Sequence, residues 1–444
     1  MSNPPDPLPS SGQPVVYVDR EELAELLRSC ATGIAEGRAY EWEGENVAHL
    51  RVHPALHAYG EVSGCLFLPE GAPESLAPAT GADVRRIVRY GGTPEEPTAN
   101  VSCRAPDGRS VPIAASFLPA RSELHSRSRG ILEIDALAGR RVAIVGLGSF
   151  GSQIAIELAK AGVGAFSLFD FDRVELHNLM RHTCVLQDLG RLKTDALRDA
   201  ILGKNPYATV DLFPIDVNRE EALLEAEVAK ADLVICATDN NRSRFTLQGA
   251  LLRQRRPCLF GRAVTRAEGG DVFRYRPGGP CYCCLIGNGW YSAHAEEITD
   301  EASARRDGRI AAYVSPEDAA AVVQVGLSAD IAPICNLMEK LALVELSRGT
   351  SSPLADLDAE LVHDYYVWAN RRERHYGNWA PFPTAGQRPT ILRWYGARIE
   401  RDPACACCAA EPDAAGLDTG EELEARLGDM GDVSDIRLDD EEGR

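Results

Sequence analysis

Short apolar runs alternate with segments of helical periodicity through the middle of the chain. The run at 142–145 is rich in β-branched residues, as expected of a buried strand, and the segment at 154–161 repeats its apolar residues on one helical face. Predicted helices follow around Lys193 and at 220–230. Further apolar runs lie at 165–169, 210–214, 231–237, 257–262 and 272–275. This alternation predicts an α/β fold with a doubly wound, mostly parallel sheet.

A glycine-rich turn follows the first of these strands. Gly146, Gly148 and Gly151 have the spacing G-x-G-x-x-G, and Asp170 stands at the end of the next strand. An acid about 20 residues after such a turn is typical of a Rossmann-like nucleotide-binding unit, in which the acid binds a ribose hydroxyl. The glycines allow backbone N–H groups to approach phosphate at a helix N-terminus. The turn alone is equally consistent with a NAD(P)- or flavin-binding oxidoreductase.

The remaining sequence divides into segments of different composition. The start is rich in proline and serine and is predicted to be disordered, and the next segment contains one predicted helix, at 20–35, and strands at 62–68 and 111–117. A polar stretch that we expect to be mobile precedes a long apolar helix at 331–346. The predicted divisions are a disordered start at 1–14, a small N-terminal accessory α+β domain at 15–120, a main domain at 121–410 with a crossover segment at 287–320, and an acidic tail at 411–444.

Charge limits the classes of partner. The 444 residues contain 47 basic and 66 acidic side chains, a formal net charge of −19, which argues against nucleic acid and anionic membranes as partners. About half of that excess lies in the tail, which has 13 acids and three arginines. The chain has no apolar run long enough for a membrane span and no secretory signal at its start. We therefore expect a cytoplasmic location.

The thirteen cysteines indicate a metal site rather than a disulfide framework. Cys281 and Cys284 form one C-x-x-C pair and Cys405 and Cys408 form another. Two such pairs make a closed tetrahedral zinc site, and closed sites are structural. The neighbouring cysteines at 283 and 407 are surplus and are expected to be reduced thiols. Either could replace a neighbour as a metal ligand, but the x-x spacing favours the outer pairs.

Charged residues beyond the glycine turn favour a triphosphate over a hydride-carrying cofactor. Attack at an α-phosphorus builds negative charge that Lys, Arg and Mg²⁺ stabilise. Singly, each residue has an ordinary explanation: a solvated helix charge for Lys193 or Arg181, and a helix N-cap for Asp239. Together the candidates follow the order D-x-D-x-V-x-x-x-N-L-x-R, then a helix lysine, then an acid at a strand end: Asp170, Asp172, Asn178, Arg181, Lys193 and Asp239.

These residues carry a resemblance to a known family. The motifs GLGSFG, FDFDRVELHNLMRH, GRLKTDAL, CATDN, PCYCCL and RDPACACC, in this order over about 121–410, resemble the E1-like adenylyltransferases, the group of ThiF, MoeB, HesA and ubiquitin-activating enzymes. The resemblance implies that ATP–Mg²⁺ adenylates the C-terminal carboxylate of a ubiquitin-like β-grasp protein. By the same resemblance, Asp170 binds ribose, Asn178, Arg181 and Lys193 contact phosphates, Asp239 binds Mg²⁺ and the cysteine pairs bind zinc.

The resemblance also implies an arginine inserted from before the first strand, often by the other subunit of a dimer. Arg127 and Arg129 in SRSRG are the candidates, and Arg129 is the one we assign to catalysis. A homodimer is expected because the N-terminal domain is too short for a second adenylation half.

The chain departs from the family at the thioester position. Many members have a cysteine before the helix that here includes Cys335, and alignment puts Val322 at that position. No cysteine occurs between Cys284 and Cys335. Cys335 is predicted to be core, and Cys184 lies in the wrong place for this role. Hydroxyl groups in the crossover segment belong to Ser292, Ser303 and Ser315, but a hydroxyl would need a base that the sequence does not indicate.

Three histidines in the N-terminal domain carry a weaker hypothesis. His49, His53 and His57 recur at every fourth residue, as metal ligands on a helix would, but Pro54 interrupts such a helix. Ordinary surface or core histidines are the favoured interpretation.

The leading hypothesis is therefore adenylation of a ubiquitin-like protein in a bacterial conjugation pathway, with an E2-like conjugating protein as a further partner. The first alternative is a sulfur-transfer or peptide-modifying ThiF-type adenylyltransferase. An oxidoreductase with a structural zinc and a non-enzymatic scaffold are the alternatives from other classes.

Overall fold

The computed structural model describes residues 15–29, 35–41, 47–50, 61–73, 84–105, 108–118, 124–128, 130–131, 134–263, 267–287, 326–371 and 391–409. The chain divides into two compact units, 1–127 and 128–444. Each unit is described by itself. None of the helices in the described ranges is both long enough and apolar enough to cross a membrane.

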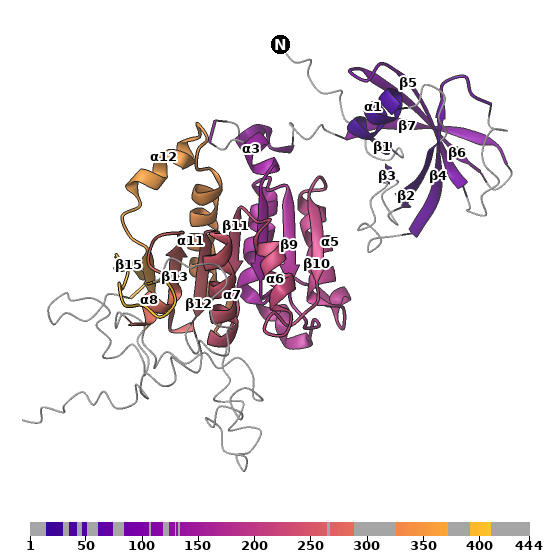
Figure 1. The fold of residues 1–444 in the computed structure, drawn as a ribbon. Coiled ribbons are helices and arrows are strands. Elements are labelled where there is room, and N and C mark those ends of the chain that lie inside the picture. Colours follow the sequence, from indigo (N-terminus) through magenta and orange to yellow (C-terminus); the bar gives the residue numbers. More distant parts are fainter. Residues whose placement is uncertain are drawn as a thin grey trace, which may run out of the picture. The chain divides into compact units, whose positions relative to one another are not determined.

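The described residues of the first unit form a closed barrel with the strand order β1-β3-β2-β4-β5-β6-β7, and helix α1 packs with it (Figure 1). The barrel closes because β1 pairs in parallel with both β3 and β7. Leu23 of the helix packs in one buried cluster with Val18, Phe67, Val88 and Val101. The elements are β1 (Val15–Asp19), α1 (Arg20–Ser29), β2 (Ala35–Glu41), β3 (Val47–Leu50), β4 (Glu61–Pro69), β5 (Val84–Gly92), β6 (Pro97–Arg104) and β7 (Ser110–Leu118).

The second unit is built on an eight-stranded sheet with the order β10-β9-β8-β11-β12-β13-β14-β15. The first five strands in this order pair in parallel, and the last three add on in antiparallel pairs. The strands are β8 (Arg141–Val145), β9 (Ala165–Phe169), β10 (Thr209–Phe213), β11 (Leu233–Cys236), β12 (Cys258–Ala263), β13 (Gly269–Tyr275), β14 (Tyr365–Ala369) and β15 (Arg393–Ala397).

Helices pack on the sheet in two groups. α4 contacts both α5 and α11, whereas α6 contacts α7. Strands β8 and β11 are nearly continuous apolar runs, as buried parallel strands are, and they are buried over almost their whole length. The helices are η3 (Ser126–Ser128), α3 (Ile134–Ala138), α4 (Ser149–Lys160), η4 (Leu176–Met180), η5 (Leu186–Asp188), α5 (Lys193–Lys204), α6 (Glu221–Val228), α7 (Asn241–Gln254), α8 (Tyr282–Gly287), α11 (Ser328–Leu346) and α12 (Pro353–Glu360).

The strand order reverses between β8 and β11. One half of the parallel sheet runs outward from β8 to β10, and the other half runs from β11 to β12. Ligands of open α/β sheets bind outside the carboxyl ends of the strands at such a switch point. The glycine turn follows β8 and Asp239 follows β11, so the sequence places its candidate residues at this position.

The mixed α/β fold with a parallel sheet is confirmed for the second unit. The structure adds a helix that we did not predict, α12, where Ser352 caps the N-terminus by accepting the Ala355 N–H and Pro353 takes the first helical position. The disordered start, the crossover segment apart from Gly287, and the acidic tail lie outside the described residues.

Candidate functional site

The glycine turn joins β8 to α4 at the switch point. Gly146 has φ +87°, and a Cβ there would lie 2.7 Å from the Ala237 carbonyl oxygen on the neighbouring segment. At Gly151 a Cβ would collide with the Gly146 carbonyl, whereas at Gly148 it would meet nothing within 4 Å. Gly148 is the N-cap of α4 and makes no side-chain capping hydrogen bond. The first N–H groups of α4 therefore stand at an open position that suits an anion.

Asp170 closes one side of the turn. Its Oδ2 accepts the Leu147 N–H at 2.7 Å and its Oδ1 accepts the Asp172 N–H at 2.8 Å. Burial raises the pKa of Asp170, and the nearby Lys193 ammonium opposes that rise. The carboxylate is thus fixed at the end of β9, where it has remaining lone pairs for a sugar hydroxyl.

Lys193 is the first residue of α5 and is almost fully buried, at 8% exposure. Its ammonium donates to Asp172 Oδ2 at 2.7 Å, and its backbone N–H donates to the Asp172 carbonyl at 3.0 Å. Burial lowers the pKa of Lys193, but the carboxylates of Asp170, Asp172 and Asp239 outweigh burial, so the net shift is upward. The side chain is therefore a fixed cation at neutral pH.

Asp239 lies just beyond β11 and is exposed. It is not the N-cap of the following helix, because Asn240 takes that position and accepts the Ser243 N–H. Its Oδ1 accepts only a 3.2 Å hydrogen bond from the Asn240 side chain among the bonds of the described residues. An exposed carboxylate at the switch point is a hard oxygen ligand that a divalent cation can use.

Asn178 lies within the short helix η4, and Arg181 directly follows that helix. Asn178 is buried, and its Oδ1 accepts the Glu175 N–H at 2.9 Å, which shapes the segment. Burial lowers the pKa of Arg181, which is half-buried. In the part of the chain that the structure describes, the Arg181 guanidinium makes no hydrogen bond or ion pair. A partly desolvated cation without a counter-charge favours an anionic ligand.

Two side chains of α4 tie the Arg181 segment to the glycine turn. Ser152 Oγ accepts the Thr183 N–H at 3.4 Å, and Gln153 Nε2 donates to the Arg181 carbonyl at 3.1 Å. Sequence reasoning missed both residues, and it missed His182 as well. The available signal was the presence of polar Ser152 and Gln153 in the first turn of a helix that is otherwise apolar on its packed side.

The arrangement brings three carboxylates and two cations to one edge of the sheet. Asp170, Asp172 and Asp239 all act electrostatically on Lys193. Three carboxylates exceed the positive charge of one lysine, so a polyphosphate would enter this site most favourably together with a divalent cation. Mg²⁺ accepts carboxylate and phosphate oxygens in just this combination, so the donor set fits it.

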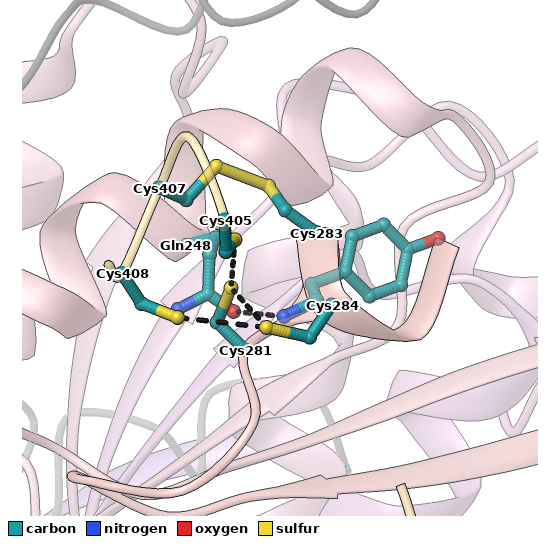
Figure 2. The surroundings of a disulfide bond; sticks show 8 residues. Gln248, Cys281, Cys283, Cys284, Cys405, Cys407 and Cys408 are labelled. Atoms are coloured by element: carbon teal, nitrogen blue, oxygen red, sulfur yellow. Dashed lines mark hydrogen bonds between the residues drawn. A yellow bond between two sulfur atoms is a disulfide. The ribbon is translucent and has the colours of Figure 1, made fainter. Parts of the chain in front are cut away.

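The cysteine pairs meet in one buried cluster (Figure 2). The Sγ–Sγ distances are 3.7 Å from Cys281 to Cys284, 3.6 Å from Cys281 to Cys405 and 3.5 Å from Cys284 to Cys408. A tetrahedron with Zn–S bonds of about 2.3 Å has sulfur–sulfur edges of about 3.8 Å. The four thiols are therefore spaced so that they can hold a metal ion, and all four are buried.

The two surplus cysteines form a disulfide, Cys283–Cys407, with Cα atoms 6.5 Å apart. The expectation that they are reduced thiols is thus wrong for this structure. The segments 281–284 and 405–408 contribute three cysteines each. The disulfide and the four-thiol cluster therefore bring together the same two pieces of chain, as Figure 2 shows. Next to them, the Tyr282 N–H donates to Gln248 Oε1 of α7 at 2.9 Å.

Of the remaining candidate nucleophiles, the two that the structure describes are buried thiols with raised pKa values. Cys184 is buried and packs with Val174 and Ala196, and burial raises the pKa of its thiol. Cys335 is fully buried in α11, and burial raises its pKa strongly. Val322 and the three candidate serines, Ser292, Ser303 and Ser315, lie outside the described residues.

Of the candidate arginines and histidines before the first strand of the sheet, the structure describes Arg127 and His49. Arg127 is exposed in η3, at the end of the first unit, and Arg129 lies outside the described residues. His49 lies on strand β3 rather than on a helix, and His53 and His57 are outside the described ranges. The helical histidine pattern is therefore wrong at the one position that the structure describes.

A doubly wound sheet with a glycine turn, an acid and two cations at its switch point defines a nucleotide-binding protein of the Rossmann-like class. The ThiF family model matches residues 125–350, which is about half of the chain. The chain belongs to the ThiF family, and the resemblance to E1-like adenylyltransferases is confirmed.

Two named relatives match about a third of the chain. The molybdopterin-synthase adenylyltransferase of Escherichia coli (strain K12) is 40% identical over 153 residues, 34% of this chain and 60% of that protein. The adenylyltransferase and sulfurtransferase MOCS3 of Drosophila virilis is 34% identical over 151 residues, 34% of this chain and 33% of that protein. The chain thus spans about 60% of the bacterial relative and a third of the insect one.

Among solved structures, Escherichia coli MccB with ATP matches with a TM-score of 0.43 and 18% identity, covering 62% of this chain and 68% of MccB. PaaA matches with a TM-score of 0.42 and 21% identity, covering 58% of this chain and 82% of PaaA. These values are too low to bear on activity or substrate.

Proposed function

We propose that this protein uses ATP–Mg²⁺ to adenylate the C-terminal carboxylate of a ubiquitin-like β-grasp protein in a bacterial ubiquitin-like conjugation pathway. The observation that carries the proposal is the buried Lys193 ammonium beside Asp170, Asp172 and Asp239. On the neighbouring segment, the Arg181 guanidinium has no counter-charge among the described residues. A hydride-transfer enzyme has no need of such a charge arrangement, whereas transfer at a triphosphate requires one. Family membership supports the same conclusion.

Each residue has a distinct part in this proposal. Gly146, Gly148 and Gly151 shape the turn that leaves the N–H groups of α4 open to phosphate, and Asp170 binds the ribose. Asn178 orders the segment that carries Arg181. The substrate carboxylate oxygen forms a bond to the α-phosphorus of ATP. The bond between the α-phosphorus and the oxygen that bridges it to the β-phosphorus breaks, and pyrophosphate leaves. Lys193 and Arg181 stabilise the charge that builds on the phosphate oxygens.

Two metal ions belong to the proposal. Asp239, with Asp172 close to the same ammonium, would hold Mg²⁺, which when bound neutralises phosphate charge. Cys281, Cys284, Cys405 and Cys408 would hold Zn²⁺ as a structural ion, because a closed set of four thiolates leaves no position for a substrate.

The product is an acyl-adenylate. Because this chain has no cysteine at the usual thioester position, the acyl group passes directly from the adenylate to an acceptor. An E2-like conjugating protein is the proposed acceptor, and the N-terminal unit is the proposed recognition module for it or for the substrate. We also propose a cytoplasmic homodimer in which Arg129, with Arg127 as the alternative, reaches the nucleotide of the partner.

A sulfur-carrier protein is the second candidate substrate, because the names of both relatives refer to molybdopterin synthase or to sulfur transfer. A peptide is a third. The oxidoreductase alternative has no support from the family to which the chain belongs.

The test is pyrophosphate release with ATP, Mg²⁺ and purified β-grasp proteins. We expect release with wild-type protein, and loss of about a hundredfold or more in Lys193→Ala and Asp239→Asn, because each removes charge stabilisation of the transition state. Lys204→Ala is the matched control, since Lys204 is an exposed lysine on the same helix and should retain full activity. Absence of release with every carrier, or full activity in Lys193→Ala, would contradict the proposal.

A further inference from the structure

Leu147 lies between the first two glycines of the turn, and its peptide groups are held from two sides. Its N–H donates to Asp170 Oδ2 at 2.7 Å, and its carbonyl oxygen lies 2.6 Å from His182 Nε2. Its side chain is fully buried. The turn is thus fixed by two side chains that come from different segments after β9.

His182 has a defined tautomer in this arrangement. Its Nδ1 accepts the Cys184 N–H at 2.9 Å, so the ring proton is on Nε2 and is donated to the Leu147 carbonyl. The ring is 9% exposed. Burial lowers its pKa to about 4, with Lys193 and Arg181 acting in the same direction and the Leu147 carbonyl and Asp188 opposing them. The imidazole is therefore neutral at physiological pH.

The histidine also links the turn to the candidate phosphate-binding arginine. Arg181 directly precedes it, and Gln153 and Ser152 of α4 hold the backbone on both sides of it. One short segment thus fastens the glycine turn, the start of α4 and Arg181 together. A donor that fixes a binding loop in advance lowers the ordering cost of binding.

We propose that His182 is a positioning residue for the nucleotide: by holding the Leu147 carbonyl it keeps the N–H groups of the turn and the Arg181 guanidinium directed at the same phosphates. The residue touches no substrate. The inference rests on the proposed function only for the identity of the nucleotide. Nucleotide affinity is set by the hydrogen bond from His182 Nε2, rather than by the size of the ring or by its Nδ1 contact.

Two substitutions separate the hydrogen bonds of the ring. A glutamine amide nitrogen reaches about as far as Nε2, so His182→Gln can still donate to Leu147, whereas the shorter His182→Asn reaches only the Nδ1 position and can accept from Cys184. We expect calorimetry to give an ATP–Mg²⁺ Kd about five- to tenfold weaker for His182→Asn and within twofold of wild type for His182→Gln. Equal affinities for the two variants would overturn the inference.

Amide hydrogen exchange without nucleotide provides a readout that is independent of ATP. We expect the peptide that contains Leu147 and Gly148 to exchange faster in His182→Asn than in wild type and His182→Gln, while peptides of β9 stay protected in all three. Unchanged exchange in His182→Asn would overturn the inference. If the three proteins differ in exchange as expected but the wild type does not bind ATP, the proposed function fails and the positioning role of His182 stands.

Discussion

At the scale of single residues, the glycines of the turn differ in whether a side chain would fit. Gly146 combines a positive φ with the close approach of the Ala237 carbonyl, whereas Gly148 has an ordinary φ of −74° and open space around it. The two positions therefore have different duties. Gly146 permits the fold of the turn, and Gly148 leaves room for a ligand.

This difference gives a matched pair of variants. Gly146→Ala should lower the free energy of unfolding by about 2 to 4 kcal/mol, because it strains the backbone and pushes on Ala237. Gly148→Ala should stay within about 0.5 kcal/mol of wild type. Its methyl group should nonetheless weaken ATP binding. Thermal denaturation and calorimetry measure the two effects, and equal destabilisation by both variants would refute the assignment.

Glu339 of α11 makes stability depend on pH. Burial, together with Glu157 of α4, raises the pKa of its carboxyl from 4.5 to about 7, and Lys160 opposes the shift. A raised carboxyl pKa means that the native state prefers the protonated form. This preference costs no stability below pH 4.5. Its cost grows as the pH rises from 4.5 to about 7 and is fully present above that pH.

Glu339→Gln should therefore increase the free energy of unfolding by about 1 to 3 kcal/mol at pH 8 and by almost nothing at pH 4. Denaturant titrations at the two pH values measure the difference. Glu360→Gln, at an exposed position, is the control and should change neither value. A gain from Glu339→Gln that is equal at both pH values would show that charge is not its cause.

The sequence predicts the charged residues of the site better than the residues that support them. Asp170, Asp172 and Lys193 could be named because they occur together and in a fixed order after the glycine turn. His182 and Ser152 could not be assigned a role, since their partners are backbone groups whose positions depend on the folded turn. Backbone hydrogen bonds of this kind leave no pattern in side-chain spacing.

At the scale of elements, the disulfide joins α8 to the segment after β15, and the proposed zinc ion would join the same two pieces of chain through four thiolates. The disulfide spans 124 residues, and the metal cluster spans the same interval. Either link closes nearly the same loop and so limits the entropy of the unfolded chain. The stabilisation that this limit gives is therefore lost only when both links are opened.

A metal chelator alone, or a dithiol reductant alone, should thus lower the free energy of unfolding by about 1 kcal/mol, and both together by about 4 to 5 kcal/mol. Thermal denaturation of the whole protein under the four conditions measures this. Cys283→Ser should reproduce the effect of the reductant, and Cys103→Ser, at a free cysteine outside the cluster, should not. Additive losses would show that the links act independently.

Element prediction succeeded where the apolar pattern was strong and local. The strands of the parallel sheet and the helix α11 are apolar enough to be found from periodicity. Strands β2 and β3, with the sequences AEGRAYE and VAHL, lack alternation of that kind. Their place in a barrel depends on pairing with distant strands, which spacing within one sequence does not indicate.

At the scale of the whole molecule, the proposed homodimer makes a prediction that one subunit cannot satisfy. If an arginine from 127–129 enters the partner's site, neither Lys193→Ala nor the double variant Arg127→Ala/Arg129→Ala is active as a pure dimer. Each lacks a different half of the same site.

Mixing equal amounts of the two inactive proteins, with time for subunit exchange, should restore about a quarter of wild-type activity, because half of the dimers are mixed and each has one intact site. Pyrophosphate release measures the recovery. The control is a mixture of Lys193→Ala with Asp239→Asn, whose defects lie on the same subunit as the site and should not complement. Full activity of the double arginine variant alone would contradict an arginine supplied from this segment.

The architecture of the second unit could be predicted because its motifs occur in order along the chain. The candidate residues follow three parallel strands that are neighbours in the sheet: Gly146 follows β8, Asp170 and Lys193 follow β9, and Asp239 follows β11. Carboxyl ends of parallel strands lie at one edge of the sheet, so these positions could be placed there from the sequence. The barrel and the disulfide could not be predicted. Both depend on long-range partners: strand pairing in the first case, and a choice among six neighbouring thiols in the second.

The central claim is that the glycine-turn site holds ATP for attack by a carboxylate. ATP–pyrophosphate exchange with a β-grasp protein tests it most directly, run with a free and an amidated C-terminus. We predict exchange with the free carboxylate, none with the amide, and none in Lys193→Ala. Exchange that is equally fast with the amidated protein, or a nicotinamide or flavin bound to the purified protein instead of ATP, would contradict the account.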